Sequence, residues 1–161
     1  MFCITFVCLG NICRSPMAEA VFSRLVEERG VAQSFKVNSF ATSDCEEGNA
    51  VYPPVQKVLR ENGYNFSHRA KKISLSDVKN ADYILVMDGM NYADLTRMTG
   101  GGYAEKILKL GDFLPVKSDI DDPWYTRDFN RTYREIDVAC QAFLNFLLDK
   151  HSQAFDYDKR H

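Results

Sequence analysis

Residues 2–16, FCITFVCLGNICRSP, decide the expected fold. The segment Phe2–Cys8 carries no charge and is rich in β-branched and aromatic side chains, as is typical of a buried strand. After a short loop, Ser15 suits a helix N-cap and Pro16 suits the first helical position. Apolar residues then recur at helical spacing until Gly30, which can end the helix. The sequence therefore predicts a buried strand that leads through a tight loop into an amphipathic helix.

The same alternation of strands and helices continues along the chain. The predicted strands are Phe2–Cys8, Phe35–Ala41, Asp82–Met87 and Lys106–Leu110, and the later helices are Pro53–Asn62, Met90–Met98 and Phe129–Lys150. This order indicates an α/β fold, a single compact doubly wound domain over residues 1–161, with a parallel sheet and helices on both faces. Ligands of such sheets bind at the carboxyl ends of the strands, where Cys8 and Asp88 are expected.

Composition excludes several classes of protein. The chain has 161 residues, with 20 basic and 22 acidic side chains and a formal charge of −2. No Lys/Arg cluster is present, which argues against a nucleic-acid binder. No apolar run approaches the roughly 18 residues of a membrane span. The five cysteines are odd in number and irregularly spaced, so we expect free thiols and a cytoplasmic location.

The loop between Cys8 and Arg14 has the composition of an anion site. Five residues separate the two, so backbone N–H groups can turn inward against the positive end of a helix. Gly10 permits a positive φ or a close approach, and Asn11 tolerates the left-handed region. Arg14 supplies a planar fork for two phosphate oxygens. The same surroundings stabilise a thiolate at Cys8, to which Ser15 can donate a hydrogen bond.

The predicted phosphate-binding loop comprises Cys8, Leu9, Gly10, Asn11, Ile12, Cys13, Arg14 and Ser15. The alternative is that Cys8 and Cys13 are small buried hydrophobic residues and Arg14 is a surface charge. The combination of strand, Cys-x5-Arg-Ser-Pro and amphipathic helix favours the phosphate site.

A second polar segment, Asp121-Asp122-Pro123-Trp124-Tyr125, follows the last predicted strand. Cleavage of a phosphate ester by a thiolate needs a general acid for the leaving oxygen, a step that contributes about 10²–10⁴-fold. Proline restricts the residue before it, so Asp122 is presented from a stiffened loop. Trp124 and Tyr125 can wall a slot for a phenyl ring. Spacing alone leaves Asp121 as an alternative acid, and an ordinary Asp-Pro turn is the alternative without function.

The motif from Cys8 to Pro16, placed close to the N-terminus, resembles that of the low-molecular-weight protein tyrosine phosphatases, and the resemblance extends over nearly the whole chain. It implies a four-stranded parallel sheet, no metal and no organic cofactor. It also implies hydrolysis of phosphotyrosine through a cysteinyl-phosphate, with Cys8 as nucleophile, Arg14 as phosphate clamp and Asp122 as general acid and base. The expected partners are tyrosine-phosphorylated proteins or small aryl phosphates, with inorganic phosphate or vanadate as inhibitors.

Three further residues match supporting positions of that family. Ser39 begins a Ser-x-Ala-Thr segment, whose serine in the family orients the loop asparagine, here Asn11. His68 lies in a Ser-His-Arg-Ala-Lys segment similar to the family's, and Asp88 matches an aspartate linked to such histidines. The resemblance thus implies that these residues hold the loop and do not react.

Two residues raise separate questions. The family often has an Asp-Pro-Arg-like segment where this chain has Tyr52-Pro53-Pro54, so Tyr52 is either an aromatic wall of the substrate site or loop packing. Cys13 is either a spectator thiol or the partner of an oxidised Cys8 in a reversible disulfide.

Three other functions compete with the phosphotyrosine phosphatase. An arsenate reductase on this fold passes oxidation to cysteines near the end of the third strand, and here no cysteine lies between Cys45 and Cys140. A protein-arginine phosphatase favours threonine where this loop has Ile12. A noncatalytic phosphotyrosine-binding module is expected to have lost the nucleophile or the acid, whereas Cys8, Arg14 and Asp122 are all present.

Overall fold

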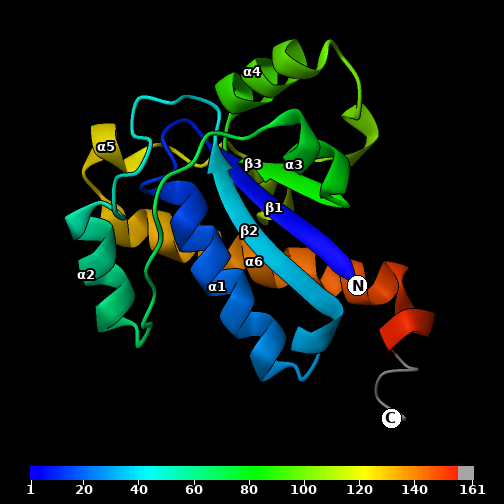
Figure 1. Cartoon of the computed structure of the whole chain (residues 1–161). Coiled ribbons are helices and arrows are strands. Elements are labelled where there is room, and N and C mark those ends of the chain that lie inside the picture. The colour runs from blue at the N-terminus through cyan, green and yellow to red at the C-terminus, as the bar shows by residue number, and fades with distance from the viewer. Residues whose placement is uncertain (156–161) are drawn as a thin grey trace.

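The structure is a computed structural model that describes residues 1–155. Its four strands form one parallel sheet in the order β2-β1-β3-β4, with helices on both faces (Figure 1). The strands are β1 (Phe2–Cys8), β2 (Phe35–Ala41), β3 (Tyr83–Val86) and β4 (Ile107–Lys109). The α-helices are α1 (Arg14–Glu28), α2 (Pro53–Glu61), α3 (Leu75–Asn80), α4 (Gly89–Thr99), α5 (Pro123–Thr126) and α6 (Phe129–Lys150). The predicted α/β fold with a four-stranded parallel sheet is confirmed, and residues 156–161 of the predicted domain lie outside the described part.

The two faces of the sheet bury separate sets of side chains, because successive residues of a strand point to opposite sides. Ile4 and Phe6 of β1 belong to the larger core, which α1 and α6 cover. Val7 belongs to the smaller core with Val78 of α3 and Leu95 of α4. Ile4, Phe6 and Val7 are all inaccessible to solvent, so β1 is buried on both faces, as its uncharged sequence predicts.

Several element boundaries differ from the prediction. The helix α1 begins at Arg14 and not at Pro16, so the predicted N-cap role of Ser15 is wrong: Cys13 occupies that position. Two helices were not predicted. The helix α3 has a capping box between Ser74 and Asp77, and the helix α5 begins directly after Asp122. Both are too short to produce a clear apolar period.

The strand order places the functional residues at one edge of the sheet. Between β1 and β3 the winding of the sheet reverses direction, and such a switch point opens a crevice at the carboxyl ends of the strands. Cys8 ends β1 and Asp88 follows β3, so both lie at this crevice. The sheet therefore explains why residues 80 positions apart in the chain share one site.

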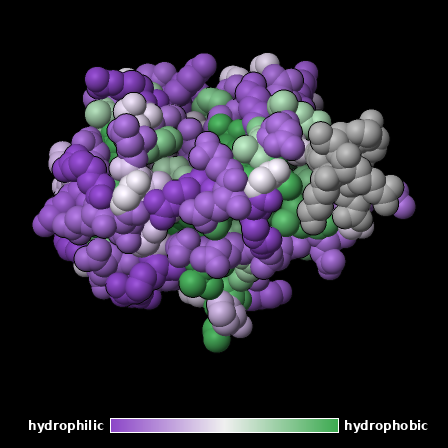
Figure 2. All heavy atoms as spheres, turned by 90° about the horizontal axis from the view of Figure 1, so that it is seen from below, coloured by the Kyte–Doolittle hydropathy of each residue, from purple (hydrophilic) through white to green (hydrophobic). Residues whose placement is uncertain are grey.

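The face at the bottom of the molecule in Figure 1 is mainly polar (Figure 2). Seen from below Figure 1, the surface is largely hydrophilic and its hydrophobic residues appear in separate small groups (Figure 2). None of the helices within residues 1–155 has the length and apolar character that crossing a membrane requires.

Candidate active site

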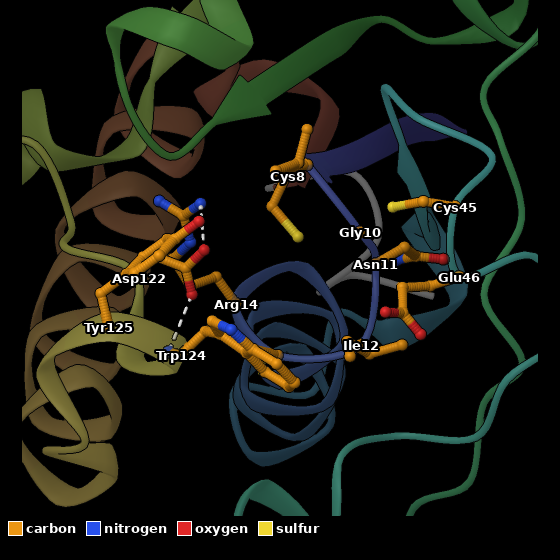
Figure 3. Close-up of a pocket in the computed structure, with 12 residues that line it drawn as sticks. Cys8, Gly10, Asn11, Ile12, Arg14, Cys45, Glu46, Asp122, Trp124 and Tyr125 are labelled. Carbon is orange, nitrogen blue, oxygen red and sulfur yellow. Dashed lines mark hydrogen bonds and ion pairs between the residues drawn. The ribbon is translucent and has the colours of Figure 1, made fainter.

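A cavity of about 220 Å³ opens at the carboxyl end of β1 (Figure 3). Its lining residues are Cys8, Leu9, Gly10, Asn11, Ile12, Cys13, Arg14, Cys45, Glu46, Asp122, Trp124 and Tyr125. The structure thus brings the predicted phosphate loop and the Asp122 segment to one site, although more than a hundred residues separate them. Cys45 and Glu46 were not predicted to take part, because nothing local in their sequence distinguishes them from other loop residues.

Cys8 is buried at the start of the loop and its sulfur meets the beginning of α1. Its Sγ lies 3.0 Å from Ser15 Oγ, and the Ser15 N–H donates to the same sulfur over 3.4 Å. Donors and a helix N-terminus stabilise a negative charge at this position. Ser15 is therefore placed to stabilise a thiolate and not to cap the helix.

Asn11 gives the loop its turn. It adopts a left-handed conformation with a φ of 59°, whereas Gly10 does not. Gly10 instead permits a close approach, since a Cβ there would lie 3.3 Å from Glu46 Cγ. The buried Asn11 side chain donates to Ser15 Oγ over 2.7 Å and to Ser39 Oγ over 3.1 Å. Its Oδ1 accepts from the Lys71 N–H, which ties the turn to the segment after β2.

Ser39 and His68 both contact Asn11 directly, and a carboxylate that the sequence analysis missed, that of Glu19, links the two to each other. His68 Nε2 lies 2.6 Å from Asn11 Oδ1, and Ser39 Oγ donates to Glu19 Oε1 over 2.6 Å. His68 Nδ1 lies 3.7 Å from the same Glu19 oxygen. Burial raises the pKa of Glu19 and lowers that of His68, since it penalises the charged form of each. The only sequence signal for Glu19 is a carboxylate within the apolar first half of α1.

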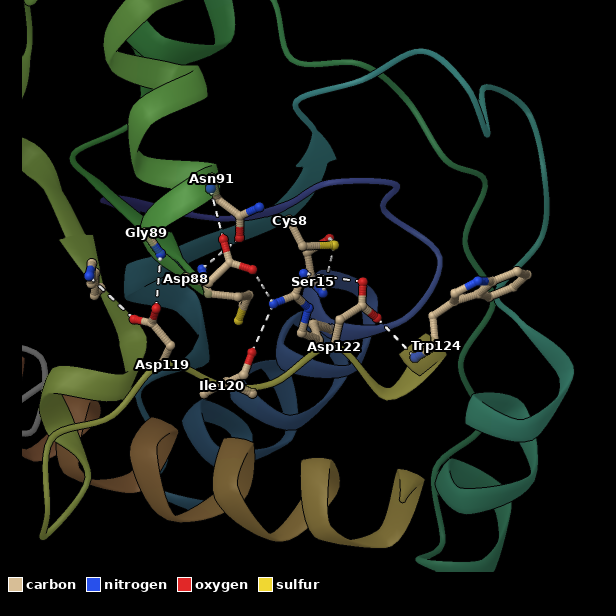
Figure 4. Close-up of polar contacts among 12 residues, drawn as sticks. Cys8, Ser15, Asp88, Gly89, Asn91, Asp119, Ile120, Asp122 and Trp124 are labelled. Atoms are coloured by element: carbon tan, nitrogen blue, oxygen red, sulfur yellow. Dashed lines mark hydrogen bonds and ion pairs between the residues drawn. The ribbon is translucent and has the colours of Figure 1, made fainter. Parts of the chain in front are cut away.

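Arg14 is 2 % exposed and is held by two fixed acceptors, Asp88 and the Ile120 carbonyl oxygen, which lie close together in Figure 4. Its Nη1 donates to Asp88 Oδ2 over 2.7 Å and to the Ile120 carbonyl oxygen over 2.8 Å. Burial opposes its charge, but Cys8 and the carboxylates of Asp88 and Asp122 raise the pKa of Arg14 above its ordinary value. Arg14 therefore stays cationic where an anion has to bind.

The expected link between Asp88 and a histidine is wrong. Asp88 contacts Arg14 through Oδ2 and caps α4 by accepting from the Asn91 N–H through Oδ1. Within residues 1–155 no histidine contacts Asp88, and His68 serves the other end of the loop. Asp88 lies at the end of β3 on the Arg14 side, which explains the difference.

The structure separates the two candidate acids. Asp122 lines the cavity, caps α5 by accepting from the Trp124 N–H over 3.0 Å, and lies 3.5 Å from Arg14 Nη2. Asp121 does not line it, and its carboxylate lies 3.6 Å from Arg131 on the surface. Only Asp122 is therefore placed beside the phosphate loop.

Trp124 and Tyr125 line one side of the cavity mouth, as predicted, and lie opposite Cys45 and Glu46 (Figure 3). Tyr52 does not line the cavity. Its ring packs against Trp124, with centroids 4.9 Å apart. Of the two roles considered for Tyr52, the structure agrees with packing, because the residue supports the wall from outside the cavity.

Cys13 is buried within the loop as a free thiol. Burial, together with the nearby Cys8, strongly raises the pKa of the Cys13 thiol. It is therefore protonated at neutral pH. Within the described residues, no group of three or more His, Cys, Asp or Glu side chains is arranged to hold a metal ion.

Comparison with known proteins shows which family has this sequence and this fold. The sequence model of the family "Low molecular weight phosphotyrosine protein phosphatase" matches residues 3–154. The family's protein from Schizosaccharomyces pombe is 42% identical over 146 residues, which cover 88% of this chain and 94% of the relative. The crystal structure of YfkJ from Bacillus subtilis superposes with a TM-score of 0.90 at 34% identity, covering 94% of this chain and 97% of the other.

A further neighbour is a crystal structure of a Drosophila arginine phosphatase, with a TM-score of 0.83 and 32% identity over 89% of this chain and 96% of the other. The cavity, the sequence match and the structural neighbours define a cysteine-containing phosphatase fold. The chain belongs to the low-molecular-weight phosphotyrosine protein phosphatase family, whose members are hydrolases.

Proposed function

We propose that this enzyme hydrolyses phosphotyrosine with Cys8 as the nucleophile. The observation that carries the proposal is the position of the Cys8 sulfur, which lies in the cavity within hydrogen-bond distance of the Ser15 hydroxyl and the Ser15 N–H. Arg14 and Asp122 line the same cavity. A nucleophile, a cation and an acid therefore line one cavity of about 220 Å³.

In the first step the substrate phosphate binds between Arg14 and the loop N–H groups. The Cys8 thiolate attacks phosphorus in line, and the bond from phosphorus to the tyrosine oxygen breaks. Protonated Asp122 gives its proton to the departing oxygen. The products of this step are free tyrosine hydroxyl and a cysteinyl-phosphate, and the fixed charge of Arg14 stabilises the transition state.

In the second step water attacks the cysteinyl-phosphate. Asp122 is now a carboxylate and accepts the proton from that water, while the bond from phosphorus to sulfur breaks. Cys8 leaves as a thiolate, which Ser15 is placed to stabilise, and inorganic phosphate is released. Asn11, Ser39, His68 and Asp88 take no part in bond changes and hold the loop or Arg14 in place.

The proposed substrates are tyrosine-phosphorylated proteins or small aryl phosphates, because Trp124 and Tyr125 offer aromatic surface at the mouth. Inorganic phosphate and vanadate are the expected inhibitors, since both fit the same anion site. All five cysteines are free, which supports a reducing, cytoplasmic location.

The test is hydrolysis of matched peptides that carry phosphotyrosine, phosphoserine or phosphoarginine, with and without a metal chelator, by wild type and Cys8→Ser. We expect phosphotyrosine turnover that survives the chelator and is abolished in Cys8→Ser. Preference for phosphoarginine would instead assign the enzyme to the activity named for the Drosophila neighbour. Binding without turnover of any peptide would contradict the enzymatic proposal.

A further inference from the structure

Tyr52 connects the phosphate loop to the segment that carries Asp122. Its backbone N–H donates to the Ile12 carbonyl oxygen over 2.9 Å, so its position is tied to the loop. Its hydroxyl accepts a hydrogen bond from Arg127 Nη1 over 2.9 Å. Arg127 immediately follows α5, the short helix that begins after Asp122. Two hydrogen bonds through one residue therefore join both halves of the site.

Arg127 ends α5 in a left-handed backbone conformation. It has a φ of 60°, a left-handed value that few residues other than glycine adopt. Its guanidinium carbon lies 5.8 Å from the centre of the Tyr52 ring and 5.3 Å from that of Trp124. The three side chains form one cluster beside the cavity wall, which we call the Tyr52–Arg127–Trp124 cluster.

The helix α5 needs such an anchor, because its four residues cannot hold a helix by themselves. Among the described residues, the one ion pair between Asp122 and the phosphate loop is with Arg14 Nη2, at 3.5 Å. Nη1 is already occupied by Asp88 and Ile120, so Nη2 is the terminal nitrogen left to bind an anion. A bound phosphate dianion competes for Nη2 and therefore weakens this ion pair between Asp122 and the loop.

Tyr52 and Arg127 do not line the cavity, so a bound phosphate does not displace the hydrogen bond between them. We propose that Tyr52 and Arg127 are positioning residues that hold α5, and with it Asp122 and Trp124, against the phosphate loop when substrate is bound. This inference rests on the proposed role of Asp122 as general acid. It also gives Tyr52 a function other than the predicted wall.

The proposal predicts an effect that depends on the leaving group. Phenyl phosphate needs a proton on its departing oxygen, whereas p-nitrophenyl phosphate leaves as a stable anion. A displaced Asp122 therefore slows the first substrate more than the second, while general damage to the fold slows both alike. The ratio kcat/KM is the suitable measure, since it covers the steps up to and including cleavage of the ester.

The experiment compares Tyr52→Phe, Arg127→Ala and Arg127→Lys with wild type on both substrates. Tyr52→Phe and Arg127→Ala should each lower kcat/KM for phenyl phosphate about fivefold, and change that for p-nitrophenyl phosphate less than about twofold. The double variant should lose no more than the larger single loss, because both changes remove one contact. Arg127→Lys keeps a donor and should recover part of the activity. Arg134→Ala, an exposed arginine on α6, is the matched control and should change neither rate.

Asp122→Asn distinguishes the possible failures. If it slows phenyl phosphate selectively while Tyr52→Phe and Arg127→Ala do not, the positioning inference is wrong and the acid assignment stands. If Asp122→Asn itself shows no selective loss, the acid assignment fails and this inference fails with it. Equal losses on both substrates in Tyr52→Phe and Arg127→Ala, or additive losses in the double variant, also overturn the proposal.

Discussion

The phosphate loop and the helix α5 form the two halves of the site, and they differ in burial and in hydrogen bonding. In the loop, Asn11 is inaccessible to solvent, and Cys8 and Arg14 are at most 3 % exposed. Across the cavity, Trp124 is 43 % exposed and Tyr125 is 78 % exposed. One half is part of the core and has many fixed hydrogen bonds, while the other lies on the surface and has few.

This difference separates two kinds of function. A loop whose Cys8, Asn11 and Arg14 are buried and hydrogen-bonded is preorganised, so it treats every phosphate ester alike. An exposed helix with few contacts affects mainly those substrates that need its acid or its aromatic surface. Changes in the loop should therefore lower all activities together, and changes in α5 should depend on the substrate.

The largest effect is expected for Arg14→Lys. Lysine cannot hold two phosphate oxygens in one plane, and it removes the Nη1 that donates to Asp88. We expect kcat/KM to fall about 10³-fold or more for both phenyl phosphate and p-nitrophenyl phosphate. Steady-state kinetics with a thermal unfolding control measures this. A loss that differs tenfold between the substrates would contradict a uniform role for the loop.

Asp122→Asn should lower kcat/KM about 10²-fold for phenyl phosphate and less than about tenfold for p-nitrophenyl phosphate. The amide cannot supply a proton to the leaving oxygen, although its size is unchanged. Asp121→Asn is the matched control, because Asp121 contacts Arg131 on the surface and should leave both rates unchanged. If Asp121→Asn instead lowered kcat/KM selectively for phenyl phosphate, Asp121 and not Asp122 would be the general acid.

A smaller and uniform effect is expected for Ser39→Ala. Its hydroxyl accepts from Asn11 and donates to Glu19, so its removal loosens the turn of the loop. We expect kcat/KM to fall about tenfold for both substrates, which corresponds to one supporting hydrogen bond. The exposed Ser67→Ala is the control. A loss confined to phenyl phosphate would show that the two halves are not separable.

The smallest effect concerns Cys13, whose predicted disulfide with an oxidised Cys8 stays a prediction. The thiolate is the form that attacks a sulfenic acid, and the pKa of Cys13 is raised by burial. After peroxide treatment, the Cys8–Cys13 disulfide should therefore form slowly at neutral pH, and its rate of formation should rise about tenfold per pH unit. Peptide mapping over time measures it. A pH-independent rate would contradict the assignment of Cys13 as the attacking thiol.

The sequence predicted the loop half of the site better than the α5 half. The strand Phe2–Cys8, the strand Phe35–Ala41 and the helix Phe129–Lys150 were predicted with the bounds that the structure has. Buried strands and long amphipathic helices have clear periodic patterns, so local sequence is sufficient for them. The phosphate loop could be predicted equally well, because its residues are adjacent in the chain.

The remaining features depend on contacts between distant segments. Spacing could not separate Asp121 from Asp122, since only the path of α5 directs one of them into the cavity. The position of Tyr52 depends on where Trp124 and Arg127 lie, and neither is near it in the sequence. Asp88 shows the same limit, because its place after β3 was predictable and its partner Arg14 was not.

The most direct test of the account is to trap the covalent intermediate. Wild type and Asp122→Asn are mixed with p-nitrophenyl phosphate, quenched rapidly in acid, digested and analysed by mass spectrometry. The account predicts one phosphoryl group on the peptide of Cys8, at a higher level in Asp122→Asn because the activation of water is impaired. The absence of phosphorylated Cys8 in both proteins during active turnover, or a phosphoryl group on another residue, would contradict it.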